Sequence, residues 1–132
     1  MYIPMQVDYG VRALVDLAKH ESTSPIKASE IANRQNIPQP YLSKLLLTLQ
    51  KKGLTKSETG PNGGHSLATK PNEINLTMVM NHLGSPLNLL ECIKTPDSCE
   101  KAASCEQRPI WQKVEKAVSD VLNTTTISDL IE

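Results

Sequence analysis

Three cysteines in the second half of the chain are the residues whose type and spacing best suit chemistry. They follow the pattern Cys92-x6-Cys99-x5-Cys105, in a segment with little helical periodicity that precedes a helical stretch. Thiolates are the usual protein ligands of iron–sulfur clusters. A polar loop can wrap three thiolates round one inorganic core, so the spacing indicates an iron–sulfur cluster site.

Other interpretations of these cysteines stay open. Free cysteines are often buried as small hydrophobic residues, although the polar neighbours of Cys99 argue against burial there. A zinc site with three Cys and one His would need a nearby histidine, and neither His82 nor His65 has a convincing spacing. A cluster-free thiol switch is also compatible, because clustered cysteines outside oxidising compartments more often serve metal or redox chemistry than disulfides.

The elements that must hold this segment are mainly helical. Apolar residues recur at helical spacing in five places, which predicts helices over residues 6–19, 28–34, 40–52 and 77–83 and from about Trp111 to Leu122. Pro40 suits the first position of the third helix, where a missing N–H costs nothing, and Gly53 suits its end. We expect Thr77 to cap the fourth helix and Thr126 to cap a short terminal one.

A hairpin is expected after the third helix. Residues 54–58 and 65–69 flank the run Gly60-Pro-Asn-Gly-Gly64, which predicts two strands with an elongated tip. Helix, turn, helix and hairpin is the order of a winged helix-turn-helix, so the sequence predicts a mainly α fold with a small β-hairpin wing. We place a DNA-binding domain at residues 1–75 and the cysteine loop with the long last helix at 76–132, as one compact unit.

The second helix of such a motif lies in the major groove, and its N-terminal residues reach base edges. Here those residues are Gln39, Tyr41, Ser43 and Lys44. Gln39 could read a base edge or cap the helix, Tyr41 and Ser43 suit phosphate, and Lys44 could contact either. Glycines let backbone N–H groups approach the sugar-phosphate chain closely, so the predicted wing contacts are Gly60, Asn62, Gly63, Gly64 and His65.

The charge distribution favours double-stranded DNA as a partner, although the formal net charge is zero. Residues 1–70 contain 9 Lys/Arg and 5 Asp/Glu, a net of +4, whereas residues 71–132 contain 5 and 9, a net of −4. A basic binding half and an acidic assembly half are therefore compatible with a neutral total.

Several other classes of protein are not expected. The sequence has no apolar run long enough for a membrane span and no secretory signal pattern at its start, so we expect a cytoplasmic protein without membrane contact. It has no nucleophile–base pair, phosphate-binding loop or catalytic metal motif, so we do not expect an enzyme.

The sequence resembles the Rrf-two family of winged-helix transcription regulators over essentially its whole length. The resemblance lies in Met5-Gln-Val-Asp-Tyr9, Ile31-Ala-x-x-x-x-Ile37, Tyr41-Leu42 with Leu45, Gly53-Leu54, the wing Gly60-Pro-x-Gly-Gly64 and the three cysteines. It implies a homodimer in which the long C-terminal helices cross, and a palindromic operator. Thr59 stands where many members carry an arginine and Ser43 where IscR-like members often carry glutamate, so a shared operator is not implied.

The cysteine spacing resembles the cluster-binding branch of the family, and the resemblance leaves the fourth ligand to be found. IscR-like members have a histidine three positions after the third cysteine, but here that position holds Arg108, which cannot ligate iron while protonated. NsrR-like members use an aspartate of the first helix from the opposite subunit, and the matching residue is Asp8. Alternatively, Asp8 caps the first helix or complements its dipole.

Together these features predict a dimeric DNA-binding regulator whose operator binding is controlled by an iron–sulfur cluster that senses nitric oxide, iron or redox state. If Asp8 binds the cluster across the dimer, it ties the cluster to helix one, which packs on the helix-turn-helix. Cluster loss would then release helix one, change the spacing of the two recognition helices and shift the dimer between binding and non-binding forms. Two alternatives remain, a cluster-free thiol-based redox regulator and a winged-helix domain that binds proteins.

Overall fold

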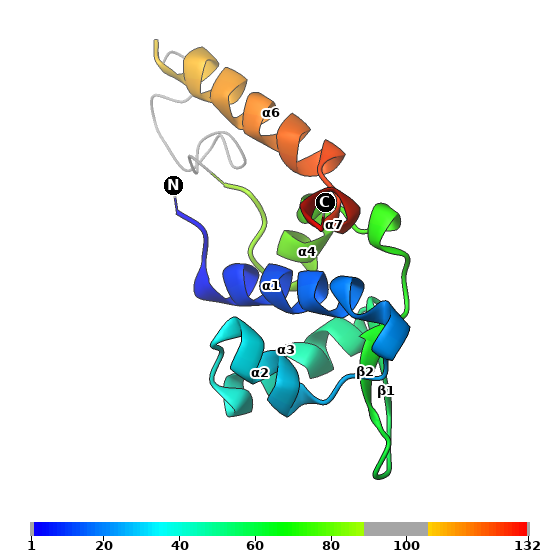
Figure 1. The fold of residues 1–132 in the computed structure, drawn as a ribbon. Helices are drawn as coiled ribbons and strands as arrows, with labels where there is room; N and C mark the ends of the chain where they lie inside the picture. The colour runs from blue at the N-terminus through cyan, green and yellow to red at the C-terminus, as the bar shows by residue number, and fades with distance from the viewer. Residues whose placement is uncertain (1, 89–105, 132) are drawn as a thin grey trace.

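A computed structural model describes residues 2–88 and 106–131. Helix α1 (Met5–Lys19) crosses the middle, with α2 (Ala28–Gln35) and α3 (Gln39–Lys51) on one side of it and α4 (Leu76–His82) and α7 (Ile127–Leu130) on the other (Figure 1). The long helix α6 (Arg108–Thr124) packs on α4, and β1 (Thr55–Glu58) pairs with β2 (Gly64–Leu67) as an antiparallel hairpin. Short 3-10 turns cover Glu21–Thr23 and Pro71–Glu73. This arrangement confirms the predicted mainly α fold with a hairpin wing, whereas the domain boundary at residue 75 stays a prediction.

Helix α1 is the centre of the core because most of its faces meet another element. It contacts α2, α3, α4, α7 and β2, and Ala13, Leu14 and Leu17 are fully buried or nearly so. It comes very close to the end of α4, since a Cβ atom placed on Gly10 would lie 2.6 Å from the side chain of Leu83, the C-cap residue of α4. Any movement of α1 would therefore be felt by the helix-turn-helix and by α4 together.

A short turn joins α2 to α3, as the predicted order of helix, turn and helix requires. Helix α2 ends at Asn36 in the left-handed conformation (φ 54°), a region that asparagine tolerates. Helix α3 is held to the core by one apolar stripe, Leu42, Leu45, Leu46 and Leu49, each at most 6% exposed. Gly53, with φ 82°, follows the helix end as expected. Pro40 is the second helical residue and not the first, because α3 begins at Gln39. Proline is tolerated there as well, because a backbone N–H at this position would have no partner within the helix.

The wing is anchored to the helical part by an isolated antiparallel β-bridge between Ile26 and His65. Ile26 and His65 exchange backbone hydrogen bonds of 2.8 and 2.7 Å, and in the hairpin Glu58 pairs with Gly64. A Cβ atom on Gly64 would lie 2.6 Å from the backbone carbonyl of Ile26. The wing glycine is thus required for a close backbone approach at the base of the wing.

The caps of the later helices differ in part from the prediction. Thr77 is not the cap of α4, because the helix starts one residue earlier and the Asn75 side chain accepts a 2.8 Å hydrogen bond from the Met78 N–H. Asparagine is a better cap than threonine, and it is placed first. Thr126 does cap α7, in a reciprocal pair with Asp129. Ile127, directly after this cap, is fully buried and joins the core around α1.

Helix α6 contributes no buried residue within the part of the chain that the structure describes. Its apolar side chains are exposed instead, at 57% for Ile110, 39% for Trp111, 38% for Val114 and 61% for Val121. A helix with an uncovered apolar face is typical of an interface rather than of a free surface. Among residues 2–88 and 106–131, no helix combines the length and the hydrophobicity needed to cross a bilayer.

Candidate nucleic-acid interface

The outer face of α3 presents the side chains that the sequence assigns to DNA. Gln39, Ser43 and Lys44 are exposed in the first half of the helix, on the side away from the buried leucines. Pro38 occupies the N-cap position and no side chain caps the helix, so the Gln39 amide is not engaged as a cap and is available for a base edge. The helix thus offers an amide, a hydroxyl and an ammonium group to a partner.

Tyr41 is placed differently from the other three. Its ring meets the ring of Tyr9 edge to face, with centroids 5.4 Å apart and an interplanar angle of 82°. The side chain is half-buried and packs against the core. Tyr41 therefore packs the start of α3 against α1.

Positive charge surrounds this face. Lys44 and Lys51 are exposed on α3, Lys52 directly follows it, and Lys56 is exposed on β1. Glu58 is an exposed acid at the end of β1. These lysines lie on or next to α3 and the wing, so they could neutralise phosphates of a bound DNA and release its counterions.

The tip of the wing and its base differ in exposure. Gly60 and Asn62 are exposed at the tip, whereas Gly63 is buried and Gly64 is half-buried where the hairpin closes. His65 lies below them on β2, opposite Ser57. Burial lowers the pKa of His65, and its Nδ1 is buried with no hydrogen-bond partner within the described part of the chain. His65 therefore presents a neutral ring at the base of the wing and not a cation at its tip.

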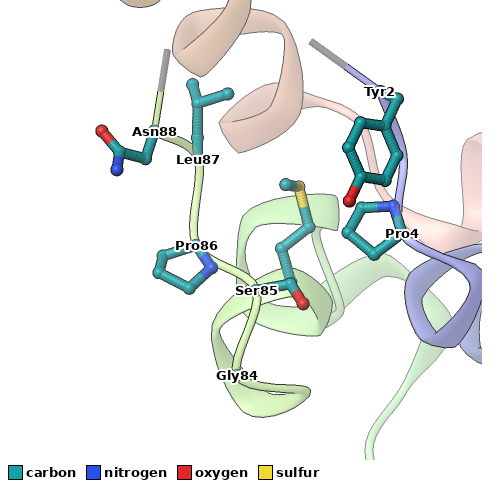
Figure 2. A pocket seen from close by; sticks show the side chains of 8 residues that line it. Tyr2, Pro4, Gly84, Ser85, Pro86, Leu87 and Asn88 are labelled. Carbon is teal, nitrogen blue, oxygen red and sulfur yellow. The ribbon is translucent and has the colours of Figure 1, made fainter. Parts of the chain in front are cut away.

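Cys92, Cys99 and Cys105 lie outside the described residues. The segment leading to them can be followed to Asn88, four residues before Cys92. A hollow of about 370 Å³ lies beside this segment. Figure 2 shows Tyr2 and Pro4 on one side of it, facing the stretch from Gly84 to Asn88. The start of the cysteine segment thus lies against the residues that precede α1.

Gln6 holds this arrangement together. Its side-chain amide donates hydrogen bonds of 2.9 Å to the Leu83 carbonyl and 2.6 Å to the Ser85 hydroxyl. Gln6 also borders a second hollow that Tyr41 and Lys44 line. One side chain of α1 therefore lies between the segment that leads to the cysteines and the start of α3.

Asp8 is not the cap of α1. The N-cap residue is Pro4, and Asp8 lies in the first turn, where a negative charge still complements the helix dipole. Its two carboxylate oxygens accept hydrogen bonds of 3.1 Å from Arg12 Nε and Nη2. Asp8 also borders an apolar groove formed by α1, α4, α6 and α7. Met80 lines both this groove and the hollow beside Gly84–Asn88.

Arg12 continues from Asp8 to the helix-turn-helix. Its Nη1 donates a 3.3 Å hydrogen bond to the Gln35 carbonyl at the end of α2, and its guanidinium lies 5.5 Å from the centre of the Tyr9 ring, which in turn meets Tyr41. The sequence prediction missed Gln6 and Arg12. The i, i+4 spacing of Asp8 and Arg12 could have identified the ion pair, whereas Gln6 bonds to residues 77 and 79 positions away.

A metal site cannot be assembled from the described residues alone. No group of three or more His, Cys, Asp or Glu side chains comes together in residues 2–88 and 106–131. The ligand set that the sequence predicts depends on the cysteines, so its geometry lies outside the described residues.

Comparisons with known proteins bear on the whole chain. The family model described as Rrf2, an iron-dependent transcriptional regulator, matches residues 3–132. Protein rrf2 of Nitratidesulfovibrio vulgaris is 38% identical over 123 residues, which cover 93% of this chain and 82% of that protein.

Two solved structures have the same fold. The global cysteine regulator CymR of B. subtilis matches with a TM-score of 0.81 and 30% identity, over 99% of this chain and 96% of that one. IscR of T. potens matches with a TM-score of 0.77 and 30% identity, over 99% and 86%. Because both regulators are this similar, the fold alone does not separate one mode of regulation from the other.

Proposed function

The chain belongs to the Rrf2 family of transcriptional regulators, and on this basis we propose that it binds a palindromic operator as a homodimer, with α3 in the major groove and the β1–β2 wing on the neighbouring backbone. Its relatives are regulators of transcription, so the chain is a DNA-binding regulator and not an enzyme. The observation that carries the proposed binding mode is the outer face of α3, which is polar and basic at its N-terminal half while its inner face is fully buried.

The uncovered apolar face of α6 supports the homodimer. Helix α6, which carries these exposed residues, lies on the side of α1 opposite α3 and the wing (Figure 1). A two-fold interface there would leave α3 and the wing of both subunits free to bind DNA. A dimer with two-fold symmetry binds a palindromic site, one half-site for each subunit.

Lys44 should give the clearest single-residue test of the binding mode. Exchanging Lys44 for alanine should weaken operator binding about tenfold and reduce the slope of log affinity against log salt by about two, one phosphate contact for each subunit. Fluorescence anisotropy of a labelled duplex over a range of salt concentrations measures both. Lys113→Ala removes the same charge from an exposed site on α6 and should change neither. Equal effects of the two variants would refute the proposed placement of α3.

We also propose that Cys92, Cys99 and Cys105, with Asp8 of the partner subunit, hold an iron–sulfur cluster that controls this binding. The donor set fits such a group, because three thiolates supply soft ligands and the Asp8 carboxylate is 45% exposed. A bound cluster would supply the reactive iron that responds to the signal. A carboxylate is a harder and weaker partner for that iron than a thiolate, so the Asp8 position would be the labile one.

The ion pair of Asp8 suggests how this chain would transmit the change. To ligate iron, Asp8 must give up at least one of its hydrogen bonds to Arg12, and the cost is small because both side chains are more than 40% exposed. Arg12 also contacts the Gln35 carbonyl and the Tyr9 ring. The state of Asp8 thus biases how α1 holds the end of α2 and the start of α3.

This part of the proposal is tested on protein purified without oxygen. We expect a broad visible absorption near 400 nm or above, with iron and acid-labile sulfide in the same preparation. Asp8→Ala should fold as well as the wild type but lose this absorption faster under a chelator, whereas Asp120→Ala should lose it at the wild-type rate. Equal operator affinities of the holo and apo forms would refute control of DNA binding by the cluster.

The likeness to CymR supports a second candidate, a cluster-free regulator that responds through its thiols. The same preparation decides between them. Colourless protein without iron or sulfide, even after reconstitution, would favour thiol chemistry and leave the DNA-binding proposal standing.

A further inference from the structure

We propose that Leu47 contacts the 5-methyl group of a thymine in each half of the operator and so helps to determine the recognised sequence. This inference rests on the proposed placement of α3 in the major groove. Leu47 is not among the residues that the sequence pattern assigns to DNA, and its role follows from its position in the folded helix.

Leu47 is separated from the other leucines of α3. Four of them, Leu42, Leu45, Leu46 and Leu49, form the buried stripe and are at most 6% exposed. Leu47 is 51% exposed in the middle of the helix. The core therefore does not use this side chain, although it lies within an unbroken run of three leucines.

Its neighbours on the helix surface are the predicted DNA contacts. Residues spaced i, i+3, i+4 and i+7 share one face of a helix, and Pro40, Ser43, Lys44 and Leu47 have this spacing. All four are exposed, and exposed Lys51 follows one turn later. If Ser43 and Lys44 face the groove, Leu47 faces it as well.

The chemistry of the groove limits what an apolar side chain can contact there. Bases present hydrogen-bonding groups on the major-groove edge, and the methyl group of thymine is the apolar feature of that edge. Lys44 and Lys51 flank Leu47 with positive charge, which favours an anionic partner over an apolar protein surface. The uncovered apolar face of α6 lies on the other side of α1 (Figure 1), so Leu47 does not extend it.

The test removes the methyl group without changing base pairing. A duplex is first selected from a randomised library with the wild-type protein, and each thymine is then replaced by deoxyuridine. We expect each half-site to contain one sensitive thymine. Replacing either of these two thymines alone should weaken wild-type binding about fourfold, as loss of one buried methyl group predicts, and replacing both should weaken it about fifteenfold.

Leu47→Ala should bind the parent duplex more weakly and should be insensitive to the same replacement. Leu130→Ala removes an exposed leucine from α7, away from α3, and should keep the wild-type response to deoxyuridine. Circular dichroism and thermal unfolding should show Leu47→Ala folded as the wild type, because the side chain is outside the core.

Two results would overturn the assignment. One is that no deoxyuridine replacement weakens wild-type binding, and the other is that Leu47→Ala keeps the wild-type sensitivity at every thymine. Failure of the wild type to select any duplex would instead refute the proposed function, so the two failures are distinguishable.

Discussion

Replacing Asp16 with alanine should lower the free energy of unfolding at neutral pH by about 2 kcal/mol, less than for a fully buried ion pair because its partner Arg34 is 36% exposed. Asp16 is fully buried in α1. Its carboxylate accepts hydrogen bonds of 2.9 and 2.7 Å from Arg34 and 3.0 Å from the Gln35 side chain, both at the end of α2. The alanine variant would leave these donors without their acceptor and would loosen the segment that leads into α3.

The effect of Asp16 should depend on pH in a defined direction. Burial alone would raise the pKa of Asp16, but the hydrogen bonds from Arg34 and Gln35 and the charge of Arg34 outweigh it and lower the pKa below its usual value of 3.8. A lowered pKa means that the carboxylate stabilises the folded state at pH values above the unfolded-state pKa. This stabilisation is lost as the pH falls through the folded-state pKa. The difference between the wild type and Asp16→Ala should therefore be constant near neutrality and shrink in strong acid.

Urea unfolding at several pH values, followed by circular dichroism, measures both effects. Asp120→Ala is the matched control, because Asp120 pairs with Lys116 at 2.9 Å on the surface, with side chains 61% and 77% exposed. That variant should lose at most about 0.5 kcal/mol. Asp16→Asn should fall between the two, since the amide oxygen can still accept from Arg34. A loss for Asp16→Ala no larger than that of Asp120→Ala would contradict this account of how α2 is held.

The elements that local patterning controls could be predicted from the sequence. The spacing of leucines in α3 fixes which face is buried, and the glycine-rich run before His65 fixes the hairpin. Both signals depend only on residues close together in the chain. The polar outer face of α3 followed from the same spacing, as what remained after the buried stripe.

Contacts between distant elements could not be predicted in the same way. Asp16 lies on an amphipathic helix, and an aspartate there is normally expected at the surface. Its burial depends on hydrogen bonds from Arg34 and Gln35, which are 18 and 19 positions later in the chain. Asp8 has the features of a cap, but Pro4 is the N-cap residue and the Asp8 carboxylate pairs with Arg12. For charged and amide side chains on helices, the tertiary structure thus determines the burial and the hydrogen-bond partners, which the local sequence does not reveal.

Introducing glutamate at Val121 should convert the protein to a monomer and weaken operator binding about 100-fold. Val121 is 61% exposed and shares one face of α6 with Ile110 and Val114, at i, i+4 and i+11. In a two-fold interface the substitution would bury one carboxylate of each subunit against the apolar face of the other, which carries a large desolvation cost. A monomer binds one half-site only and loses the gain in affinity that comes from linking two sites.

The helix itself should tolerate this change, because glutamate has a higher helix propensity than valine and the site is exposed in the single chain. Gln112→Glu adds the same charge on the opposite face of α6, where Gln112 is exposed, and should leave both properties unchanged. Light scattering after size exclusion gives the mass, and fluorescence anisotropy gives the affinity. If Val121→Glu stays dimeric, the α6 face is not the interface. If it becomes monomeric and still binds at wild-type affinity, the operator is not bound by a dimer, because losing the α6 contact would then leave DNA binding unchanged.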